Sequence, residues 1–542
     1  MNNSIAGDVP INLKSQAELV NAWKKTFDDS TSSFQPEIIE TLVSWILLTK
    51  DRAYKIKKAL KLDFLDFSNL SSRKFYCEEE IRLNKRTAPD LYQQVIIIGG
   101  SIAHPVLNAE PILEYAVQMK RFSRESEMSG MLRDGRLKVC HVDSLARKIA
   151  YFHQNLPPLP ENGTDNIYGT YDFIHRGLEN NYNELRAVFS ALNLETELEK
   201  LDELIQLHFA ALEKREHVIG QRHSNGFVRE CHGDLHMGNV AVIDDEAVLF
   251  DCIEFAPDFR CVDVICDLAF AFTDLCHFDR PDYAWRLLNI YLEETGDYEG
   301  AALLGVFGAT HALVRAKVAA IRYLQSAEKA KMQSCLEESK KYMSLARTML
   351  QDRNAGLLIT CGLPGSGKSV FSLAALEKTG AIRIRSDIER KRHYGLGALQ
   401  SSDGIAVNIY SDEASEITYN LLEKLAVMLL DAKFRVIIDA AFLRKSERSR
   451  FYRLTSRKNL PYVIALVIAG PDTLIRRVTA RKLFRDDPSE AGPDVLAQKQ
   501  RQFEPLSRKE WEYAVEILNE DGNDFRSGET DWENLERRLS IS

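Results

Sequence analysis

The run Gly-Leu-Pro-Gly-Ser-Gly-Lys-Ser at residues 362–369 constrains this chain more than any other stretch, because it fits G-x-x-x-x-G-K-[ST]. An apolar run at 356–361 precedes it and predicts a buried strand, and residues 370–377 are typical of the first turns of a helix. A strand, a glycine loop and a helix N-terminus together form a cradle for phosphate. The residues expected to form it are Gly362, Pro364, Gly365, Ser366, Gly367, Lys368 and Ser369.

Two side chains of this loop carry the chemistry expected of it. Lys368 would reach the β- and γ-phosphates of a nucleotide, and the Ser369 hydroxyl would hold Mg²⁺. Lys368 is therefore assigned both to nucleotide binding and to catalysis. We expect ATP, or GTP in its place, together with Mg²⁺.

Composition limits the class of protein. A chain of 542 residues exceeds one ordinary domain, and a net charge of −9 disfavours nucleic acid or an anionic membrane surface as a general partner. The nine cysteines are scattered with no zinc spacing, which favours a reducing cytoplasm over a metal-thiolate site. Residues 1–14 lack a signal sequence, and the longest apolar stretches, including 301–314, are read as too short or interrupted to span a bilayer. We expect a cytoplasmic protein without a membrane segment.

A lysine and a glutamate follow each other early in the chain in the order that a kinase needs. Residues before about 36 are polar and are expected to be peripheral. An alternating strand at 53–57 would place Lys55 on the same face as a small residue, where it could reach phosphates. A helix at 71–86 follows, with three consecutive glutamates at 78–80 that could hold this lysine. Glu80 is preferred as the partner, and Glu78 and Glu79 stay open as alternatives.

A second informative site lies at 231–240, where the sequence is Cys-His-Gly-Asp-Leu-His-Met-Gly-Asn-Val. Asp234 and Asn239 have the separation of the aspartate and asparagine in H-R-D-x-x-x-x-N. A predicted hairpin follows, and Asp251 closes its second strand. Phosphoryl transfer needs a carboxylate that orients the attacking hydroxyl and oxygen ligands that hold Mg²⁺.

These residues, with the later segment Asp-Val-Ile-Cys-Asp-Leu-Ala at 263–269, resemble the aminoglycoside phosphotransferase-like kinases. The resemblance implies an α+β bilobal fold of the protein-kinase type. It also implies that Asp234 is the catalytic base and that Asn239 and Asp251 are Mg²⁺ ligands, and it strengthens Lys55 as the phosphate lysine. His236 is expected to order the loop rather than to bind metal.

The second half has the alternation of strands and helices of an α/β P-loop domain with a mainly parallel sheet, with strands expected at 356–361, 382–385, 434–439 and 462–469. Asp387 follows the second strand, where a carboxylate can orient or deprotonate an acceptor hydroxyl, and Arg390 lies near it to bind substrate. A helix N-cap is the alternative role for Asp387. Asp439 ends the third strand as a residue that would reach Mg²⁺ through water.

An arginine-rich segment at 476–485 resembles the lid of small P-loop kinases. Arg477, Arg481 and Arg485 share one helical face; Arg481 is assigned to catalysis and Arg485 to nucleotide binding, while a solvated basic face is the alternative. Residues 356–510 resemble the gluconate-kinase, zeta-toxin and polynucleotide-kinase-like group. The whole chain looks like a bacterial fusion of an aminoglycoside phosphotransferase-like domain at 1–354 with an AAA-type P-loop kinase domain at 355–542.

The expected function is ATP-dependent transfer of a phosphoryl group to hydroxyls of small-molecule acceptors, at two centres. One alternative makes the C-terminal centre a nucleic-acid 5′-hydroxyl kinase, which the acidic net charge disfavours. The other makes one centre an ATP-binding switch that regulates its neighbour without catalysis. The sequence does not identify either acceptor or the oligomeric state.

Overall fold

The computed structural model describes residues 12–27, 34–62, 65–160, 164–326, 328–402, 408–484, 488–520, 525 and 531–540. The chain divides into two compact units: unit 1 comprises Met1–Leu178 with Glu216–Asp274, and unit 2 comprises Glu179–Arg215 with Leu275–Ser542. Unit 2 thus contains helices that precede residue 354 as well as the P-loop domain. The expected domain boundary near residue 354 stays a prediction.

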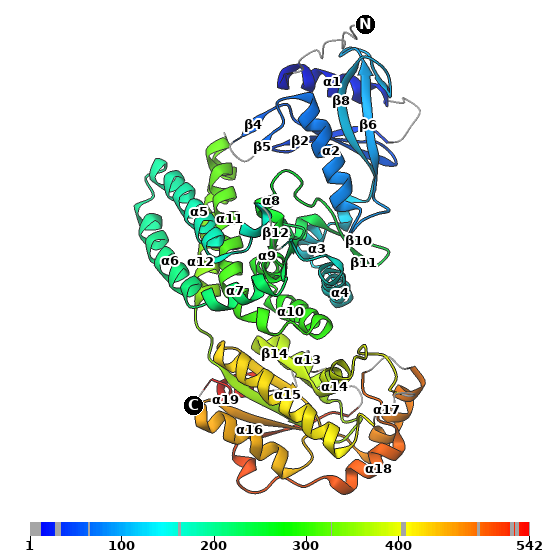
Figure 1. Cartoon of the computed structure of the whole chain (residues 1–542), viewed down its shortest axis with the longest axis vertical. Helices are drawn as coiled ribbons and strands as arrows, with labels where there is room; N and C mark the ends of the chain where they lie inside the picture. Colours follow the sequence, from blue (N-terminus) through cyan, green and yellow to red (C-terminus); the bar gives the residue numbers. More distant parts are fainter. Residues whose placement is uncertain are drawn as a thin grey trace. The chain divides into compact units, whose positions relative to one another are not determined.

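The N-terminal part of unit 1 is built on an antiparallel sheet (Figure 1). Its strand order is β1 (Glu37–Glu40), β2 (Ser44–Leu48), β3 (Arg52–Lys57), β8 (Ile112–Lys120), β6 (Tyr92–Gly100) and β7 (Pro105–Leu107). Central strand β3 pairs with both neighbours, so that Lys55 lies opposite Ile46 on β2 and Val117 on β8.

The two faces of this sheet are covered by different helices. Tyr54 and Ile56 of β3 pack in one core cluster with α1 (Leu13–Thr26), whereas Ala53 packs in another with Cys77 of α2 (Leu70–Asn84). Successive side chains of a strand point to opposite faces. The predicted alternation of the 53–57 strand therefore places Lys55 on the face that α2 covers.

The expectation that the first 35 or so residues are peripheral is wrong for α1. Leu19 is fully buried, and Val20 and Trp23 are each 1% exposed against the sheet. Their spacing gives α1 an apolar stripe, and Asn12 caps its N-terminus by accepting a hydrogen bond from the Ser15 backbone.

The rest of unit 1 is mainly helical and carries short hairpins. Strand β10 pairs with β11 as the predicted hairpin, and β9 pairs with β12. The further elements are β4 (Lys61–Leu62), β5 (Leu65–Asp66), η1 (Arg124–Ser126), α3 (Met128–Arg133), α4 (Val139–Asn155), η2 (Thr164–Ile167), α5 (Tyr171–Ala191), α7 (Glu216–Ser224), β9 (Val228–Glu230), η3 (Met237–Asn239), β10 (Val240–Ile243), β11 (Glu246–Leu249), α8 (Pro257–Arg260), β12 (Cys261–Asp263) and α9 (Val264–His277). Helices α5 and α9 each continue into unit 2.

Unit 2 contains a parallel sheet, which in the described part of the chain has five strands. Their order is β14 (Ala381–Arg385), β15 (Arg435–Asp439), β13 (Gly356–Cys361), β16 (Tyr462–Ile468) and β17 (Ala514–Leu518). The four predicted strands are present, and β17 adds an edge strand that the sequence did not indicate. The expected fold class, an α+β domain of the protein-kinase type followed by an α/β P-loop domain with a mainly parallel sheet, is confirmed: the first is an antiparallel sheet with helices and the second is built on the parallel sheet.

Helices cover both faces of the parallel sheet (Figure 1). Helices α15 and α16 pack together on the sheet, and α13 packs on it together with α19. The helices of unit 2 are α6 (Glu195–Glu213), α10 (Pro281–Thr295), η4 (Glu299–Leu303), α11 (Leu304–Gln325), α12 (Lys329–Leu350), α13 (Lys368–Thr379), α14 (Ser386–His393), α15 (Asp412–Asp431), α16 (Lys445–Lys458), α17 (Pro471–Phe484), α18 (Pro493–Gln502), η5 (Glu510–Glu512) and α19 (Trp532–Arg538). Helix α10 also contacts α13 and edge strand β14.

The apolar stretch at 301–314, which the sequence analysis described as too short or interrupted to span a bilayer, lies within a longer helical segment. Glu299–Gln325, which combines η4 and α11, is long and apolar enough to cross a membrane by length and composition. Of its most apolar window, 56% is buried inside the structure, as in a core helix of a globular domain. The expectation that this stretch is too short or interrupted to span a bilayer is therefore not supported by its length and composition.

We predict that Trp23→Ala lowers the free energy of unfolding by about 3–5 kcal/mol, because it removes a large side chain buried between α1 and the sheet. Chemical denaturation followed by circular dichroism would measure the change. Glu18→Ala, on the exposed side of the same helix, is the matched control and should stay within about 0.5 kcal/mol of the parent. Equal effects of the two substitutions would show that α1 is not part of the core.

Candidate functional sites

A cluster of buried charges lies between β3, α2 and the segment after β11 in unit 1. The Lys55 ammonium is 3.0 Å from Glu80 and also ion-pairs with Asp251. Of the three consecutive glutamates, Glu80 is fully buried and pairs with the lysine, whereas Glu79 instead pairs with Arg82. This is the geometry expected of a phosphate lysine held by a helix glutamate.

A second lysine completes this cluster, and the sequence analysis did not assign it a role. Lys57 is fully buried and pairs with both Glu80 and Glu254. Burial would raise the pKa of Glu80, but Lys55 and Lys57 outweigh it and hold that pKa below its usual value. Burial likewise works against the charge of Lys55, yet Asp251 and Glu80 raise its pKa well above the usual value. The cluster thus pairs two lysines with three carboxylates, and these ion pairs favour the charged forms of Lys55 and Glu80.

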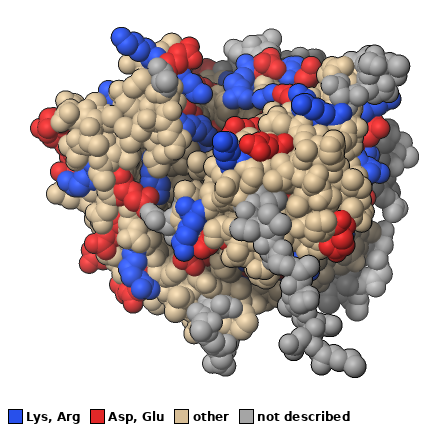
Figure 2. Space-filling view, turned by 90° about the horizontal axis from the view of Figure 1, so that it is seen from above, with Lys and Arg blue, Asp and Glu red and all other residues tan. Residues whose placement is uncertain are grey.

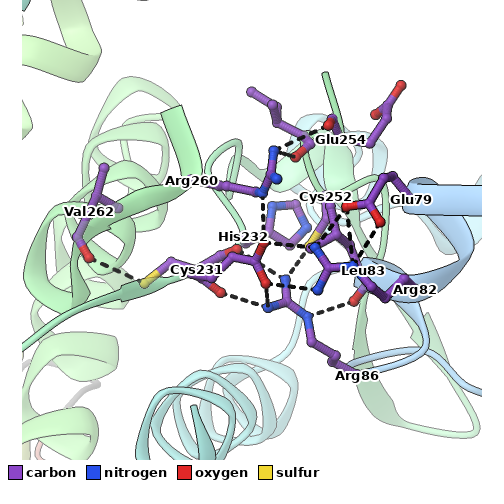
Figure 3. A network of polar contacts seen from close by, with 12 residues as sticks. Glu79, Arg82, Leu83, Arg86, Cys231, His232, Cys252, Glu254, Arg260 and Val262 are labelled. Carbon is purple, nitrogen blue, oxygen red and sulfur yellow. Dashed lines mark hydrogen bonds and ion pairs between the residues drawn. The ribbon is translucent and has the colours of Figure 1, made fainter. Parts of the chain in front are cut away.

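Helix α2 is also tied to the chain before and after the 232–239 loop, as Figure 3 shows. Arg82 donates two hydrogen bonds to the Glu230 carboxylate at 2.8 and 3.0 Å. Arg86 donates to the backbone oxygens of Glu230 at 2.7 Å and Cys231 at 3.2 Å. On the far side Arg260 donates to Glu230 and to the backbone of Glu254. Because these arginines bind fixed carbonyls and a partly buried carboxylate, they fix α2 relative to the loop.

The 232–239 loop places Asp234 and Asn239 together. The Asn239 amide donates to the Asp234 carboxylate at 3.0 Å and to its backbone oxygen at 2.9 Å. The Asp267 carboxylate fixes the start of the loop, because it accepts hydrogen bonds from the backbone nitrogens of His232 and Gly233. Gly233 has a φ of 84°, and a Cβ there would lie 2.8 Å from the Phe259 oxygen, so the turn requires glycine.

His236 orders the loop in the way expected of it. Its Nδ1 accepts a hydrogen bond from the Gly238 backbone at 3.0 Å, and its Nε2 lies 3.5 Å from the Asp234 carboxylate. Asp234 itself keeps 34% of its side chain exposed, which leaves room for an acceptor hydroxyl. The loop therefore presents a carboxylate that neighbouring groups orient without burying it.

The donors near Asp251 fit a magnesium ion. Asn239 uses its amide nitrogen toward Asp234, so its amide oxygen is the atom that could bind a cation. Asp251 adopts a left-handed φ of 64°, and Tyr92 accepts a hydrogen bond from its backbone nitrogen. Carboxylate and amide oxygens are the hard ligands that Mg²⁺ prefers, so the two predicted ligands suit this ion.

The P-loop of unit 2 joins β13 to α13 as predicted. Gly365 and Gly367 have φ values of 83° and 90°, which glycine adopts readily. Lys368 donates to the Leu363 backbone oxygen at 2.9 Å, so its ammonium lies over the loop. Pro364 and Ser366 lie within this loop, and Ser366 is buried.

Buried polar contacts also surround the predicted metal ligands of unit 2. The Ser372 hydroxyl, one turn after Ser369, donates to the Asp439 carboxylate at 3.1 Å. Asp439 is 6% exposed at the carboxyl end of β15. A hydroxyl and a carboxylate are again hard oxygen donors, so Ser369 and Asp439 fit Mg²⁺ by their chemistry.

Asp387 lies in the first turn of α14, directly after β14. The residue preceding this helix is Arg385, which makes no side-chain cap, so the N-cap alternative for Asp387 is wrong. Its carboxylate instead accepts from Arg390 at 3.1 Å, and Arg390 also lies over the Tyr410 ring at 5.0 Å. The two residues assigned to acceptor binding and deprotonation are therefore in contact.

The arginine-rich helix α17 packs on the P-loop through Leu474 and Val478, which form a small core with Leu496 of α18. Arg477 donates to the backbone oxygens of Gly365 and Asn519, so it supports the loop from within the fold. Arg481 falls within α17, and Arg485 lies outside the described residues. Their predicted roles stay predictions.

Asn519 is a loop-supporting residue that the sequence analysis missed. It follows β17 and donates from its amide to the Ser366 backbone oxygen at 2.8 Å. A Cβ added to Gly367 would lie 1.6 Å from this amide nitrogen. The sequence did not indicate a role for Asn519, because the strand before it was not predicted and only the fold brings this residue to the loop.

Comparison with known proteins gives matches to both parts of the chain. Residues 357–506 match the family model described as AAA domain. A Mycobacterium tuberculosis protein named only as uncharacterized is 26% identical over 469 residues, which cover 86% of this chain and 91% of that protein. The P-loop domain expected in the C-terminal part of the chain agrees with the match of residues 357–506 to the AAA domain model.

Two solved structures are among those that are similar to parts of this chain. A choline kinase from Cryptosporidium parvum covers 62% of this chain and 96% of its own, at 13% identity and a TM-score of 0.38. A gluconokinase from Sinorhizobium meliloti covers 34% of this chain and 90% of its own, at 15% identity and a TM-score of 0.23.

We predict that Lys57→Met lowers the free energy of unfolding by about 3–5 kcal/mol, because it leaves Glu80 and Glu254 buried with too little positive charge. Urea denaturation would measure the change. Adding Glu254→Gln should recover part of it. Lys61→Met, whose side chain is 72% exposed, should change stability little, and a comparable loss there would count against the charge argument.

We also predict that Gly367→Ala removes one class of ATP-binding site, because the new methyl group meets Asn519 and the backbone is left-handed at this position. Isothermal titration calorimetry would report the loss. Gly397→Ala is the matched control, since its nearest neighbour, Gln400, lies 4.0 Å from the added carbon. Unchanged binding by the Gly367 variant would exclude this loop as a nucleotide site.

Proposed function

We propose that this protein is an ATP-dependent phosphotransferase with two centres, each of which transfers a γ-phosphoryl group to a hydroxyl of a small molecule. One observation supports this most directly. Each unit separately brings a lysine suited to phosphate, oxygen donors suited to Mg²⁺ and a carboxylate suited to orienting a hydroxyl into one region. Positioning and charge stabilisation supply most of the catalysis in phosphoryl transfer, and these are the contributions that such groups can make.

In unit 1, Lys55 would bind the phosphates while Glu80 keeps it in place. Bound Mg²⁺ would neutralise phosphate charge, with Asn239 and Asp251 as its protein ligands. Asp234 would accept the proton of the acceptor hydroxyl, oriented by the Asn239 amide and by His236. Lys55 and Asp251 are ion-paired, so the entering triphosphate would replace the carboxylate as the partner of this lysine.

In unit 2, the backbone of the 362–369 loop and Lys368 would hold the triphosphate. Asp387 would orient or deprotonate the acceptor hydroxyl, and Arg390 would bind the acceptor beside it. Ser369 and Asp439 would hold Mg²⁺, which supplies charge neutralisation here as well. The arginines of the α17 segment would cover the transferred group.

We further propose small acceptors and a cytoplasmic location. On the face drawn in Figure 2, Lys and Arg side chains lie among Asp and Glu side chains. Together with the net charge of −9, this mixture favours a small acceptor over a nucleic-acid strand. Binding of an oligonucleotide with steep salt dependence would support the nucleic-acid alternative instead.

The test uses the full chain with ATP labelled in its γ-phosphate and a metabolite extract as the source of acceptors. Asp234→Asn and Asp387→Asn should each remove a different labelled product, with the rate falling roughly 10²–10⁴-fold. Asp258→Asn, an exposed aspartate of unit 1, is the control. If both variants leave labelling unchanged, the proposal fails. If one centre binds ATP without turnover but alters the other, the switch alternative is correct.

A further inference from the structure

Helix α10 lies outside residues 357–506, the segment that matches the AAA domain model. It nevertheless packs against β14, the edge strand of the P-loop sheet. The Asn289 side chain, 1% exposed, donates to the Ala381 backbone oxygen at 2.9 Å and accepts from the Arg383 backbone nitrogen at 2.6 Å. An amide side chain offers one donor side and one acceptor, as a peptide group does. Asn289 therefore bonds to β14 as a neighbouring strand would.

The same helix binds two arginines of this strand. Glu293, one turn after Asn289, lies 2.7 Å from the Arg383 guanidinium and 3.7 Å from that of Arg385. Residues 383 and 385 alternate along β14, so both side chains project from the same face. Arg286 adds an ion pair at 2.6 Å with Glu377 on α13, the helix that follows the P-loop.

From these arginines, contacts continue to the predicted metal ligands. Arg383 donates to the Ser369 backbone oxygen at 3.1 Å and to the Ser372 hydroxyl at 3.2 Å. Arg385 lies 3.8 Å from the Asp439 carboxylate. Helix α10 is thus two side chains away from the carboxylate assigned to Mg²⁺.

We propose that Glu293 is a positioning residue for the P-loop centre, which keeps Asp439 available to Mg²⁺ by binding Arg383 and Arg385. A guanidinium beside a carboxylate competes with a metal cation for it. The Arg385 guanidinium lies about equally far from the two carboxylates, 3.7 Å from Glu293 and 3.8 Å from Asp439, so loss of the Glu293 charge would leave Asp439 as its nearest anion of the two. This inference rests on the proposed function, because it takes Ser369 and Asp439 as the Mg²⁺ ligands.

It follows that residues 355–542 do not contain the complete P-loop centre. Asn289 and Glu293 come from the helical segment before the linker at 351–354, and both are buried against β14. The first centre's sequence region therefore supplies residues that tune the second centre. Neither residue belongs to the segment that matches the AAA domain model.

The test measures ATP binding by the full chain as Mg²⁺ is titrated, with a parallel measurement in EDTA. Glu293→Gln should raise the Mg²⁺ concentration needed for ATP binding at the P-loop centre by about tenfold, the scale of a partly screened charge near the carboxylate. Binding in EDTA should be retained, because the phosphate cradle is unchanged. Loss of binding in both conditions would mean a purely structural role and would overturn the proposal.

Charge-balancing variants make the test specific. Arg385→Gln alone should lower the Mg²⁺ requirement severalfold, and combined with Glu293→Gln it should restore the parent value. Glu294→Gln, exposed on the same helix, should change nothing. If Glu293→Gln does not fold, the single Arg385 variant decides, and an unchanged Mg²⁺ requirement there would contradict the inference.

Asp439→Asn separates this inference from the proposed function. If Asp439→Asn raises the Mg²⁺ requirement and Glu293→Gln does not, the positioning role is wrong and the metal assignment stands. If Asp439→Asn has no effect on the Mg²⁺ requirement, the metal assignment itself is wrong.

Discussion

The ion pairs of Glu80 determine how unit 1 can function. One buried carboxylate binds Lys55 and Lys57 together, and Asp251 and Glu254 each add a further ion pair to one of these lysines. Because isolated charges are costly in the protein interior, each group holds the others in place. The position of α2, the reach of Lys55 and the course of the chain after β11 are all coupled through this cluster.

Unit 2 contains a similar arrangement of a helix glutamate and two strand cations, on a different sheet. Glu293 on α10 faces Arg383 and Arg385 of β14 as Glu80 on α2 faces Lys55 and Lys57 of β3. In both units a helix glutamate pairs with two cationic side chains at alternate positions of one strand. The lysine pair lies beside the predicted phosphate position, whereas the arginine pair lies beside a predicted metal ligand. The same electrostatic arrangement can therefore serve two different parts of a nucleotide site.

Much of this arrangement is visible in the sequence, because local rules govern it. The 362–369 loop, the alternation at 53–57 and the hairpin before Asp251 each carry a short-range pattern that the structure follows. The glutamate register could have been read as well, since Cys77, Glu80 and Leu83 recur at helical spacing and are all buried. Helix α1 shows the same kind of stripe, which its polar composition obscured.

The residues that sequence analysis missed depend on distant contacts. Glu254, Asn289, Glu293 and Asn519 are single polar residues in largely apolar segments, and nothing in the sequence identifies the partners that they meet. Each reaches its site only because a strand or helix far along the chain arrives beside it. The physical signal, a satisfied buried polar group, exists only after folding.

The pairing of Asn289 with β14 has a consequence for how such a chain can be divided. β14 is an edge strand of a parallel sheet, and an uncovered edge offers backbone groups to any other chain. A cut at the polar linker would separate α10 from that edge and leave it as a template for aggregation. The linker marks where the sequence pattern changes, but the helix that covers the edge of the sheet lies before the linker in the sequence. The segment after the linker is therefore not an independent module, since the edge of its sheet is covered by a helix that precedes the linker.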